Sequence, residues 1–237
     1  MKTLALLSGG LDSCVALAMA VEEKDNPVAA LTVFYGQKHA RELKSAEAVA
    51  NHYNLKHHVV TFGSDFINNI SHATALIGKD EAIPSERRLS EMTARVPRTY
   101  VPGRNTIMLA LAQSIAEANG YDRIYCGFNA VDYSGYPDCR PHFVEAWNHL
   151  ARYATKVGYI DNKPIELVAP IINFSKASVA DMGIKLNAPL HLTWSCYTGG
   201  DQPCGTCDSC IIRANAFWAI GKEDPVGPYL VKPRESF

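Results

Sequence analysis

The sequence has no excess of charge of either sign, and this limits the partners it can bind. Its 237 residues include 23 Lys and Arg against 24 Asp and Glu, a net charge of −1. Sequence-independent binding to DNA or RNA needs a clear basic excess, so we expect no nucleic-acid partner. No apolar run approaches the roughly 20 residues that span a bilayer, and no basic and apolar leader opens the sequence. These absences predict a cytoplasmic protein that binds no membrane.

The sequence also lacks the cysteine pattern of a secreted protein. It has seven cysteines, an odd number, and four of them fall within 15 residues near the C-terminus. A disulfide framework usually has an even number at wider spacing. Internal repeats and low-complexity tracts are absent too. Composition is otherwise ordinary, with 47% hydrophobic and 20% charged residues, so we expect a globular fold with a sizeable core.

No Gly-Lys-Ser or Gly-Lys-Thr occurs, which excludes a Walker-type phosphate loop. What the sequence has instead is Ser8-Gly9-Gly10-Leu11-Asp12-Ser13, placed between an apolar run and a helix-forming run. This order predicts a strand, a tight turn and a helix. Adjacent glycines can take positive φ, and backbone amides in such a turn bind anions together with the helix N-terminus. Asp12 can cap the helix or hold a magnesium ion, so the segment predicts a nucleotide-phosphate site.

Strand-like and helix-like segments alternate along the chain, which predicts an α/β fold with a doubly wound, mainly parallel sheet. We expect an α/β domain over residues 1–190 and a metal-binding C-terminal region over 191–237. Strands are predicted at 4–7, 28–35, 57–62, 123–126 and 165–169, and helices at 14–20, 40–53, 105–117, 145–156 and 175–186. Ser175 is the expected N-cap of the last of these helices.

One long segment breaks this alternation. Residues 63–102 have weak periodicity over about forty residues, and such insertions are usually lids, binding loops or disorder. Four arginines lie in it, Arg87, Arg88, Arg95 and Arg98. They either meet phosphate or carboxylate groups or belong to a solvated loop.

The C-terminal cysteines have a spacing typical of a metal site. Cys196, Cys204, Cys207 and Cys210 follow the pattern C-x7-C-x2-C-x2-C. Four thiolates form a closed tetrahedral site, which favours one structural zinc ion. An iron–sulfur cluster is the alternative, because C-x2-C-x2-C also opens ferredoxin motifs, although the usual continuation is missing. Unmetallated thiols are a third interpretation.

Two cations and one loop are candidates for substrate binding at the carboxyl ends of the strands, where doubly wound sheets bind ligands. Arg104 precedes a helix and is an anion binder by type. Lys176 opens a helix, where it opposes the helix dipole, and a phosphate partner would offset this. Residues 127–140 combine aromatic rings, carboxylates and one guanidinium, which suits a guanine-like heterocycle. Each also has a plain interpretation as a surface cation or a turn.

These segments together resemble a known family. Ser-Gly-Gly-x-Asp-Ser resembles the PP-loop of the N-type ATP pyrophosphatases, which split ATP between its α and β phosphates. The rest of the chain is similar to the QueC family of 7-cyano-7-deazaguanine synthases. The matching segments are Phe34-Tyr35-Gly36-Gln37, Val101-Pro102-Gly103-Arg104-Asn105, residues 132–140 (Asp-Tyr-Ser-Gly-Tyr-Pro-Asp-Cys-Arg), Leu192-Thr193-Trp194-Ser195-Cys196-Tyr197 and the last three cysteines.

The resemblance implies an ATP-dependent ligase that converts 7-carboxy-7-deazaguanine and ammonia to the nitrile through an adenylated acid and an adenylated amide. It implies ATP, Mg²⁺ and one structural Zn²⁺ per subunit as cofactors. Residues implied in ATP binding are Leu7, Ser8, Gly9, Gly10, Leu11, Asp12, Ser13, Cys14, Val15, Ala16 and Leu17. Those implied in catalysis are Asp12, Lys176 and Arg104, and those in substrate binding are Asp132, Tyr133, Ser134, Asp138 and Arg140.

Rival interpretations remain at this stage. Another PP-loop enzyme is one, either a tRNA-modifying enzyme with Cys126 or Cys139 as a reactive thiol or a relative that transfers the deazaguanine group to a protein. A zinc-knuckle binding module with a nucleotide sensor is another. The family resemblance also implies a homodimer, with Trp194, Phe217 and Trp218 either at its interface or, as we favour, in the core.

Overall fold

The computed structural model describes residues 1–23, 27–35, 41–70, 74, 85, 99–129 and 136–235. Its strands are β1 (Thr3–Leu6), β2 (Val28–Phe34), β3 (Lys56–Thr61), β4 (Arg123–Tyr125) and β5 (Glu166–Val168). Its helices are α1 (Leu11–Glu22), α2 (Arg41–His52), α3 (Ser64–Ile70), α4 (Arg104–Asn119), α5 (Pro141–Ala154), α6 (Lys156–Tyr159), α7 (Lys176–Lys185) and α8 (Asp208–Trp218). Among the described residues, no helix is both long and apolar enough to cross a membrane.

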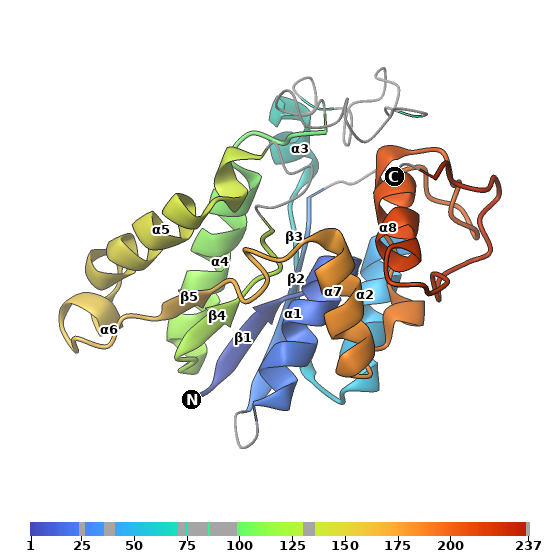
Figure 1. Ribbon diagram of the computed structural model, residues 1–237. Coiled ribbons are helices and arrows are strands. Elements are labelled where there is room, and N and C mark those ends of the chain that lie inside the picture. Colours follow the sequence, from blue (N-terminus) through green and yellow to red (C-terminus); the bar gives the residue numbers. More distant parts are fainter. Residues whose placement is uncertain are drawn as a thin grey trace.

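The five strands form one parallel sheet in the order β3-β2-β1-β4-β5. The chain moves outward from β1 to β3, and then returns to place β4 against the other side of β1. The loops after β1 and β4 therefore diverge, which opens a crevice at the carboxyl ends of these two strands. This arrangement confirms the predicted doubly wound α/β fold (Figure 1).

Helices cover both faces of the sheet, because alternate side chains of the central strand are buried on opposite sides. Ala5 and Leu7 pack with α1, α2, α7 and the end of α8. Leu4 packs on the other side, with α4 and α5. Figure 1 shows these two helical layers. A strand so enclosed is mostly apolar, which explains why β1 and β2 are nearly continuous apolar runs.

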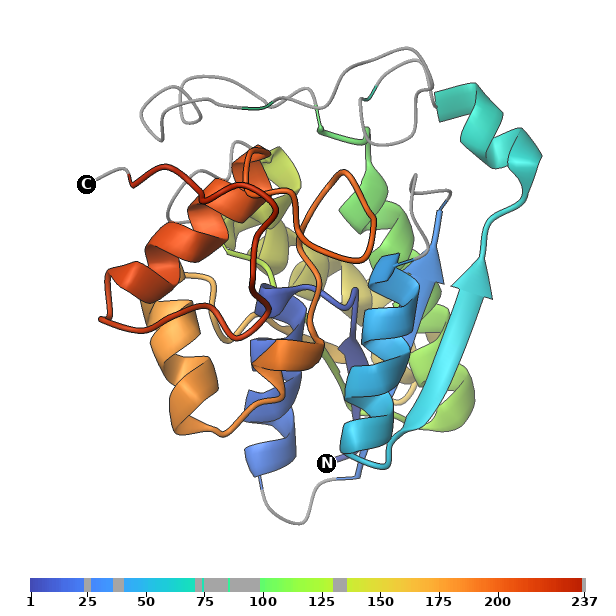
Figure 2. The ribbon, with the colours of Figure 1, turned by 90° about the vertical axis from the view of Figure 1, so that its right-hand side faces the viewer.

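The C-terminal region lies beside the loop that follows β1. Figure 2 shows the chain from residue 190 onward (orange to red) next to α1 and α2 (blue). The Trp194 N–H donates to the Gly9 carbonyl at 2.8 Å. Trp194 is 3% exposed and Phe217 is fully buried, so both belong to the core of this chain.

Most predicted elements are confirmed to within a few residues, and two differ. The helix expected at 145–156 begins at Pro141, because proline at the first helical position lacks only an N–H that has no partner there anyway. The insertion contains the short helix α3, whose Phe66 ring packs on Phe62 at 4.5 Å between centroids. The four arginines of the insertion lie outside the described residues.

We predict that Gly9→Ala destabilises the fold. Gly9 has φ +89°, and a Cβ there would lie 2.2 Å from the Glu42 carbonyl oxygen. Positive φ and the clash together should lower the free energy of unfolding by about 2 kcal/mol or more. Urea unfolding measures this, with Gly63→Ala as the control, since a Cβ at Gly63 would meet nothing within 4 Å. Equal stability of the two variants would contradict the packing of α2 on this loop.

Candidate active site

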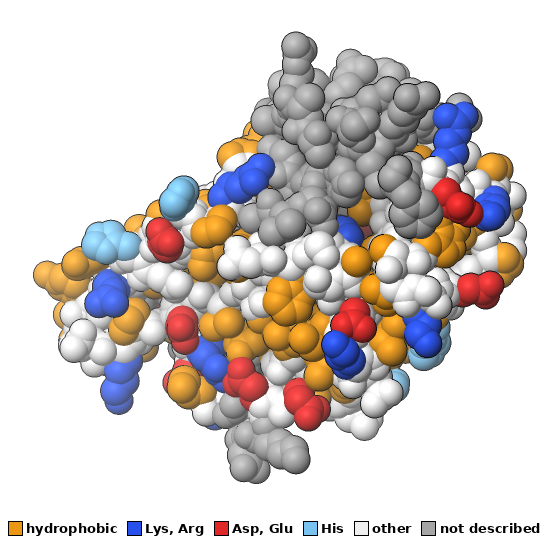
Figure 3. All heavy atoms as spheres, viewed as in Figure 1, with side chains coloured by type: hydrophobic (Ala, Val, Ile, Leu, Met, Phe, Trp, Pro, Cys, Tyr) orange, Lys and Arg blue, Asp and Glu red, His pale blue; other side chains and the backbone are white. Residues whose placement is uncertain are grey.

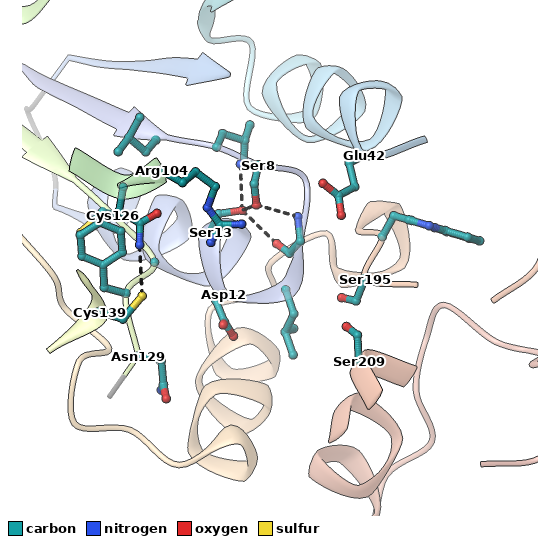
Figure 4. A pocket seen from close by; sticks show the side chains of 18 of the residues that line it. Ser8, Asp12, Ser13, Glu42, Arg104, Cys126, Asn129, Cys139, Ser195 and Ser209 are labelled. Carbon is teal, nitrogen blue, oxygen red and sulfur yellow. Dashed lines mark hydrogen bonds between the residues drawn. The ribbon is translucent and has the colours of Figure 1, made fainter. Parts of the chain in front are cut away.

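A cavity of about 360 Å³ opens at the carboxyl ends of β1 and β4, a size typical of small-molecule sites. It is called the central cavity below. Figure 4 shows Glu42 and Ser195 on one side of it and Cys126 and Asn129 on the other, with the phosphate loop between them. The polar residues that line it are Ser8, Asp12, Ser13, Tyr35, Glu42, Arg104, Asn105, Asn129, Tyr136, Lys176, Ser195, Tyr197, Ser209 and Arg213.

The phosphate loop, Ser8–Ser13, is held open by its own hydroxyl groups. The Ser13 hydroxyl donates to the Gly10 carbonyl at 3.1 Å and accepts the Ser8 N–H at 3.2 Å. The Ser8 hydroxyl lies 3.0 Å from that of Ser13 and accepts the Gly10 N–H at 3.3 Å. Gly9 alone takes positive φ, while Gly10 is extended and caps α1. The loop therefore presents a helix N-terminus and serine hydroxyls to the cavity, which suits phosphate.

Gly127 explains how closely the loop after β4 approaches this helix. A Cβ at Gly127 would lie 2.7 Å from the Ser13 nitrogen. Only glycine allows β4 and the start of α1 to pack at this distance, so Gly127 fixes one wall of the cavity next to the phosphate loop.

Asp12 and Lys176 form an ion pair across the cavity. Each stands in the first turn of its helix, Asp12 in α1 and Lys176 in α7. A lysine at a helix N-terminus is unfavourable by itself, and the Asp12 carboxylate offsets that charge. The second carboxylate oxygen of Asp12, Oδ1, is buried and has no hydrogen-bond partner among the described residues. A carboxylate of this chain thus offsets the unfavourable placement of the Lys176 charge at a helix N-terminus.

Arg104 is held between two aromatic rings. Its guanidinium lies 5.8 Å from the ring centre of Tyr35 and 5.7 Å from that of Tyr136, and it donates to the Tyr35 hydroxyl at 3.2 Å. Burial opposes its charge, but the two neighbouring phenol groups hold the pKa of Arg104 above its usual value. The side chain therefore stays cationic inside the central cavity.

Glu42, in the first turn of α2, brings a carboxyl group to the same part of the cavity. Burial raises its pKa from 4.5 to about 7, while the charge of Arg104 acts in the opposite direction. It makes no hydrogen bond or ion pair with any residue that the structure describes. Sequence analysis did not single out Glu42, because α2 is rich in polar residues and its first turn resembles a solvated face.

The wall opposite β4 is residues 193–197, fixed by Arg213 from α8. Arg213 donates to the Thr193 hydroxyl at 2.7 Å and the Ser195 hydroxyl at 3.2 Å, and to both carboxylate oxygens of Asp224. Arg213 and Asp224 side chains are each 3% exposed. A fifth donor reaches the Leu190 carbonyl at 3.2 Å. All five hydrogen bonds of Arg213 thus hold the guanidinium in place, and two of them bind the wall directly.

The four predicted cysteine ligands come together beside this wall. Their Sγ atoms all lie within 4.8 Å of one another. Hydrogen bonds from the thiols of Cys207 and Cys210 and from the Cys204 N–H lower the pKa of Cys196. The Trp194 indole N–H donates to the Cys196 carbonyl at 3.0 Å. The cluster can hold a metal ion, and its protein ligands would fix the segment that lines the cavity.

The structure places the other predicted site residues in three groups. Leu7, Ser8, Gly10, Leu11, Asp12 and Ser13 line the cavity, whereas Cys14–Leu17 are buried inside α1 and do not. Asp138 accepts the Asn105 N–H at 3.2 Å and so supports the start of α4, and Arg140 is exposed before α5. Neither lines the cavity. Asp132, Tyr133 and Ser134 lie outside the described residues.

Sequence reasoning assigned no individual role to several other residues that line the cavity, although one of them, Asn129, lies within the candidate substrate loop 127–140; these residues are Tyr35, Glu42, Asn129, Ser195, Tyr197, Ser209 and Arg213. A signal was present for some of them. Tyr35 and Asn129 follow β2 and β4, where ligands bind in such sheets, and Ser195 and Tyr197 flank the first cysteine ligand.

Comparison with known proteins decides the family. A family model described as "Queuosine biosynthesis protein QueC" matches residues 2–221. The chain belongs to the QueC family. A curated relative from Trichormus variabilis, named 7-cyano-7-deazaguanine synthase, is 44% identical to this QueC protein over 97% of this chain and 99% of that protein. A relative of the same name from a Synechococcus species is 44% identical over 93% and 94% of the two chains.

Among solved structures, the QueC chain matches the U34-tRNA thiolase NcsA from Methanococcus maripaludis with its [4Fe-4S] cluster. The two are 16% identical with a TM-score of 0.46, over 80% of this chain and 57% of that chain. Family membership confirms the resemblance stated from the sequence and identifies an enzyme of queuosine biosynthesis rather than a binding module.

We predict that Cys207→Ser removes the bound metal. A cluster that loses one thiolate can no longer close a four-cysteine site, and residues 193–197 lose their anchor. The metal content should fall from about one ion per chain to near zero, with a lower melting temperature. Elemental analysis and a thermal melt measure this. Cys139→Ala is the control, since Cys139 lies outside the cluster, and equal metal content in both variants would disprove the assignment.

We also predict that the Glu42 carboxyl makes stability depend on pH. Its pKa is higher in the folded chain, so the folded state holds the proton more tightly and stability is lost as pH rises from 4.5 through about 7. Glu42→Gln lacks this loss. Its free energy of unfolding should therefore rise relative to wild type by at most about 3 kcal/mol between pH 4.5 and 8.

Urea unfolding at the two pH values tests this, with Glu47→Gln as the control because Glu47 is exposed on the same helix. A pH-independent difference between wild type and Glu42→Gln would mean that the Glu42 carboxyl does not change its pKa on folding.

Proposed function

We propose that this protein converts 7-carboxy-7-deazaguanine and ammonia to 7-cyano-7-deazaguanine, with two molecules of ATP each split to AMP and pyrophosphate. The observation that carries this proposal is the sharing of one cavity: the phosphate loop, the Asp12–Lys176 pair and Arg104 all open into it. Relatives that match nearly the whole chain bear the name of this synthase.

The lining of the cavity suggests how ATP would lie in it. Leu31, Val33 and Met108 line it with apolar surface beside β2 and α4, which suits the flat adenine ring. Ser8, Ser13 and the N-terminus of α1 would hold the departing pyrophosphate. The unpartnered Oδ1 of Asp12 fits a Mg²⁺ ion bound jointly with phosphate oxygens, which would neutralise charge on the leaving group.

Arg104 and Lys176 supply the charge that the first step needs. A carboxylate oxygen must approach the α-phosphate although both are anionic, and two fixed cations lower that repulsion. Asp132 and Tyr133, which we propose as readers of the deazaguanine edge, follow β4 in the sequence. Asp138 supports α4 from behind through Asn105, and so positions the neighbouring Arg104.

The chemistry follows from activating the same carbon twice. The substrate carboxylate attacks the α-phosphorus of ATP and releases pyrophosphate. Ammonia attacks the resulting acyl-adenylate, and the carbon–oxygen bond to AMP breaks to leave the amide. The amide oxygen then attacks a second ATP, and loss of AMP with two protons from nitrogen leaves the nitrile.

Zinc is the ion we propose for the cysteine cluster. Four cysteine ligands saturate a tetrahedral ion, so it has no open position for substrate and acts structurally. Its contribution is the fixed wall at residues 193–197. We also keep the homodimer and the cytoplasmic location as proposals.

The experiment that tests the function is an incubation of the purified protein with ATP, Mg²⁺, ammonium and 7-carboxy-7-deazaguanine, analysed by mass spectrometry. We expect AMP and the nitrile. AMP with the amide as the end product would indicate a relative that stops halfway or needs another acceptor, such as a protein. No acid-dependent AMP from folded, metal-loaded protein would disprove the synthase.

Lys176→Ala should lower kcat/KM for the acid by about 10²–10³, because a fixed cation at the reacting phosphate is removed. Steady-state kinetics measure this. Lys185→Ala is the matched control, since Lys185 lies on the same helix with its side chain 66% exposed. An equal effect of the two substitutions would show that Lys176 acts only through the stability of α7.

A further inference from the structure

The backbone of Glu42 packs directly against the phosphate loop. Its carbonyl oxygen occupies the space where a Gly9 Cβ would be, 2.2 Å away. The first turn of α2 therefore rests directly on the loop. From there the Glu42 side chain points into the central cavity, on the same side as Ser195 (Figure 4).

Among the described residues, the other carboxyl groups in and around the cavity each have a partner on at least one oxygen. Asp12 pairs with Lys176, Asp224 pairs with Arg213, and Asp138 accepts the Asn105 N–H. Glu42 differs, since its carboxyl has no hydrogen-bond or ion-pair partner in the described part of the chain. It is therefore available to exchange a proton with a molecule in the cavity.

The surroundings of Glu42 set how readily it does so. The titratable and charged groups that face it are Arg104 from α4, Tyr35 from the end of β2 and Tyr197 from the wall segment. Burial raises its pKa to about 7 against the pull of Arg104. At neutral pH the carboxyl is thus present in both its protonated and its ionised form. A general base needs both, because it must accept a proton and then release it.

The proposed synthase reaction requires a group that accepts protons, and the inference about Glu42 rests on that proposed function. When ammonia attacks the acyl-adenylate, nitrogen forms a bond to carbon and must lose one proton as AMP leaves with the electron pair. When the adenylated amide collapses to the nitrile, the same nitrogen loses two more protons. Asp12 and Lys176 are committed to each other and to phosphate, so they are poorly suited to this task.

We propose that Glu42 is a catalytic residue that accepts the protons leaving the attacking nitrogen, in both halves of the reaction. The adenylation steps transfer no proton from nitrogen and do not need it.

The test compares two nucleophiles in Glu42→Gln and wild type. Ammonia needs a base, whereas hydroxylamine is far less basic and loses its proton readily after attack, to give a hydroxamate. We expect the ammonia-dependent rate to fall about 100-fold in Glu42→Gln, within the range for general bases. With hydroxylamine we expect a fall of less than about five-fold. Glu42→Asp should recover part of the ammonia rate, and Glu47→Gln serves as the matched control.

Acid-dependent exchange of pyrophosphate into ATP, measured without any nucleophile, reports adenylation separately. If exchange or hydroxamate formation falls as far as the ammonia reaction, Glu42 binds the substrate and the proposal is overturned. An unchanged ammonia rate overturns it as well. Circular dichroism confirms that each variant is folded.

The failure of this inference is distinguishable from failure of the proposed function. Absence of acid-dependent exchange in the wild-type protein disproves the synthase, and the role of Glu42 with it. If wild type makes the nitrile and Glu42→Gln makes it at the same rate, only the proposed role of Glu42 is disproved.

Discussion

The hydrogen bond from the Trp194 N–H to the Gly9 carbonyl, 2.8 Å long, is the contact on which the arrangement of the site depends. It joins the phosphate loop after the first strand to the segment that carries the first cysteine ligand. Gly9 can offer its carbonyl this way because of its positive φ. The cysteine cluster, far along the chain from Gly9, thereby lies against the phosphate loop and forms part of the same site.

Charge in the cavity is balanced by pairs of different kinds. Asp12–Lys176 is a partly exposed pair that incoming phosphate and a cation can rearrange, since each ion would find a new partner. Arg213–Asp224 is fully buried, and breaking it would leave an uncompensated charge in the interior. The first pair can therefore take part in the reaction, whereas the second stabilises the structure.

Surface charge is mixed on the face shown in Figure 3, in line with the near-zero net charge.

The parts of the site that could be predicted from sequence are those encoded locally. The phosphate loop, the Ser175 cap and the four cysteines each occupy a short stretch whose spacing has a physical meaning. The Ser175 hydroxyl accepts the Ser178 N–H at 3.1 Å, as a cap does. Tertiary burial could not be predicted, and it is burial that distinguishes Glu42 from Glu47 on one helix. Asp138 likewise supports α4, a helix that precedes it by many residues, so its local sequence gave no hint of that contact.

Asp12 and Lys176 are separated by 164 positions, and the two helices that carry them depend on this pair to different degrees. An aspartate at the start of α1 is favourable without any partner, because it complements the helix dipole. The lysine at the start of α7 is unfavourable until α1 is in place. The support that Asp12 gives to α7 therefore depends on a contact between distant parts of the chain. The cysteine cluster closes only short loops, so metal binding can order that region without this long-range contact.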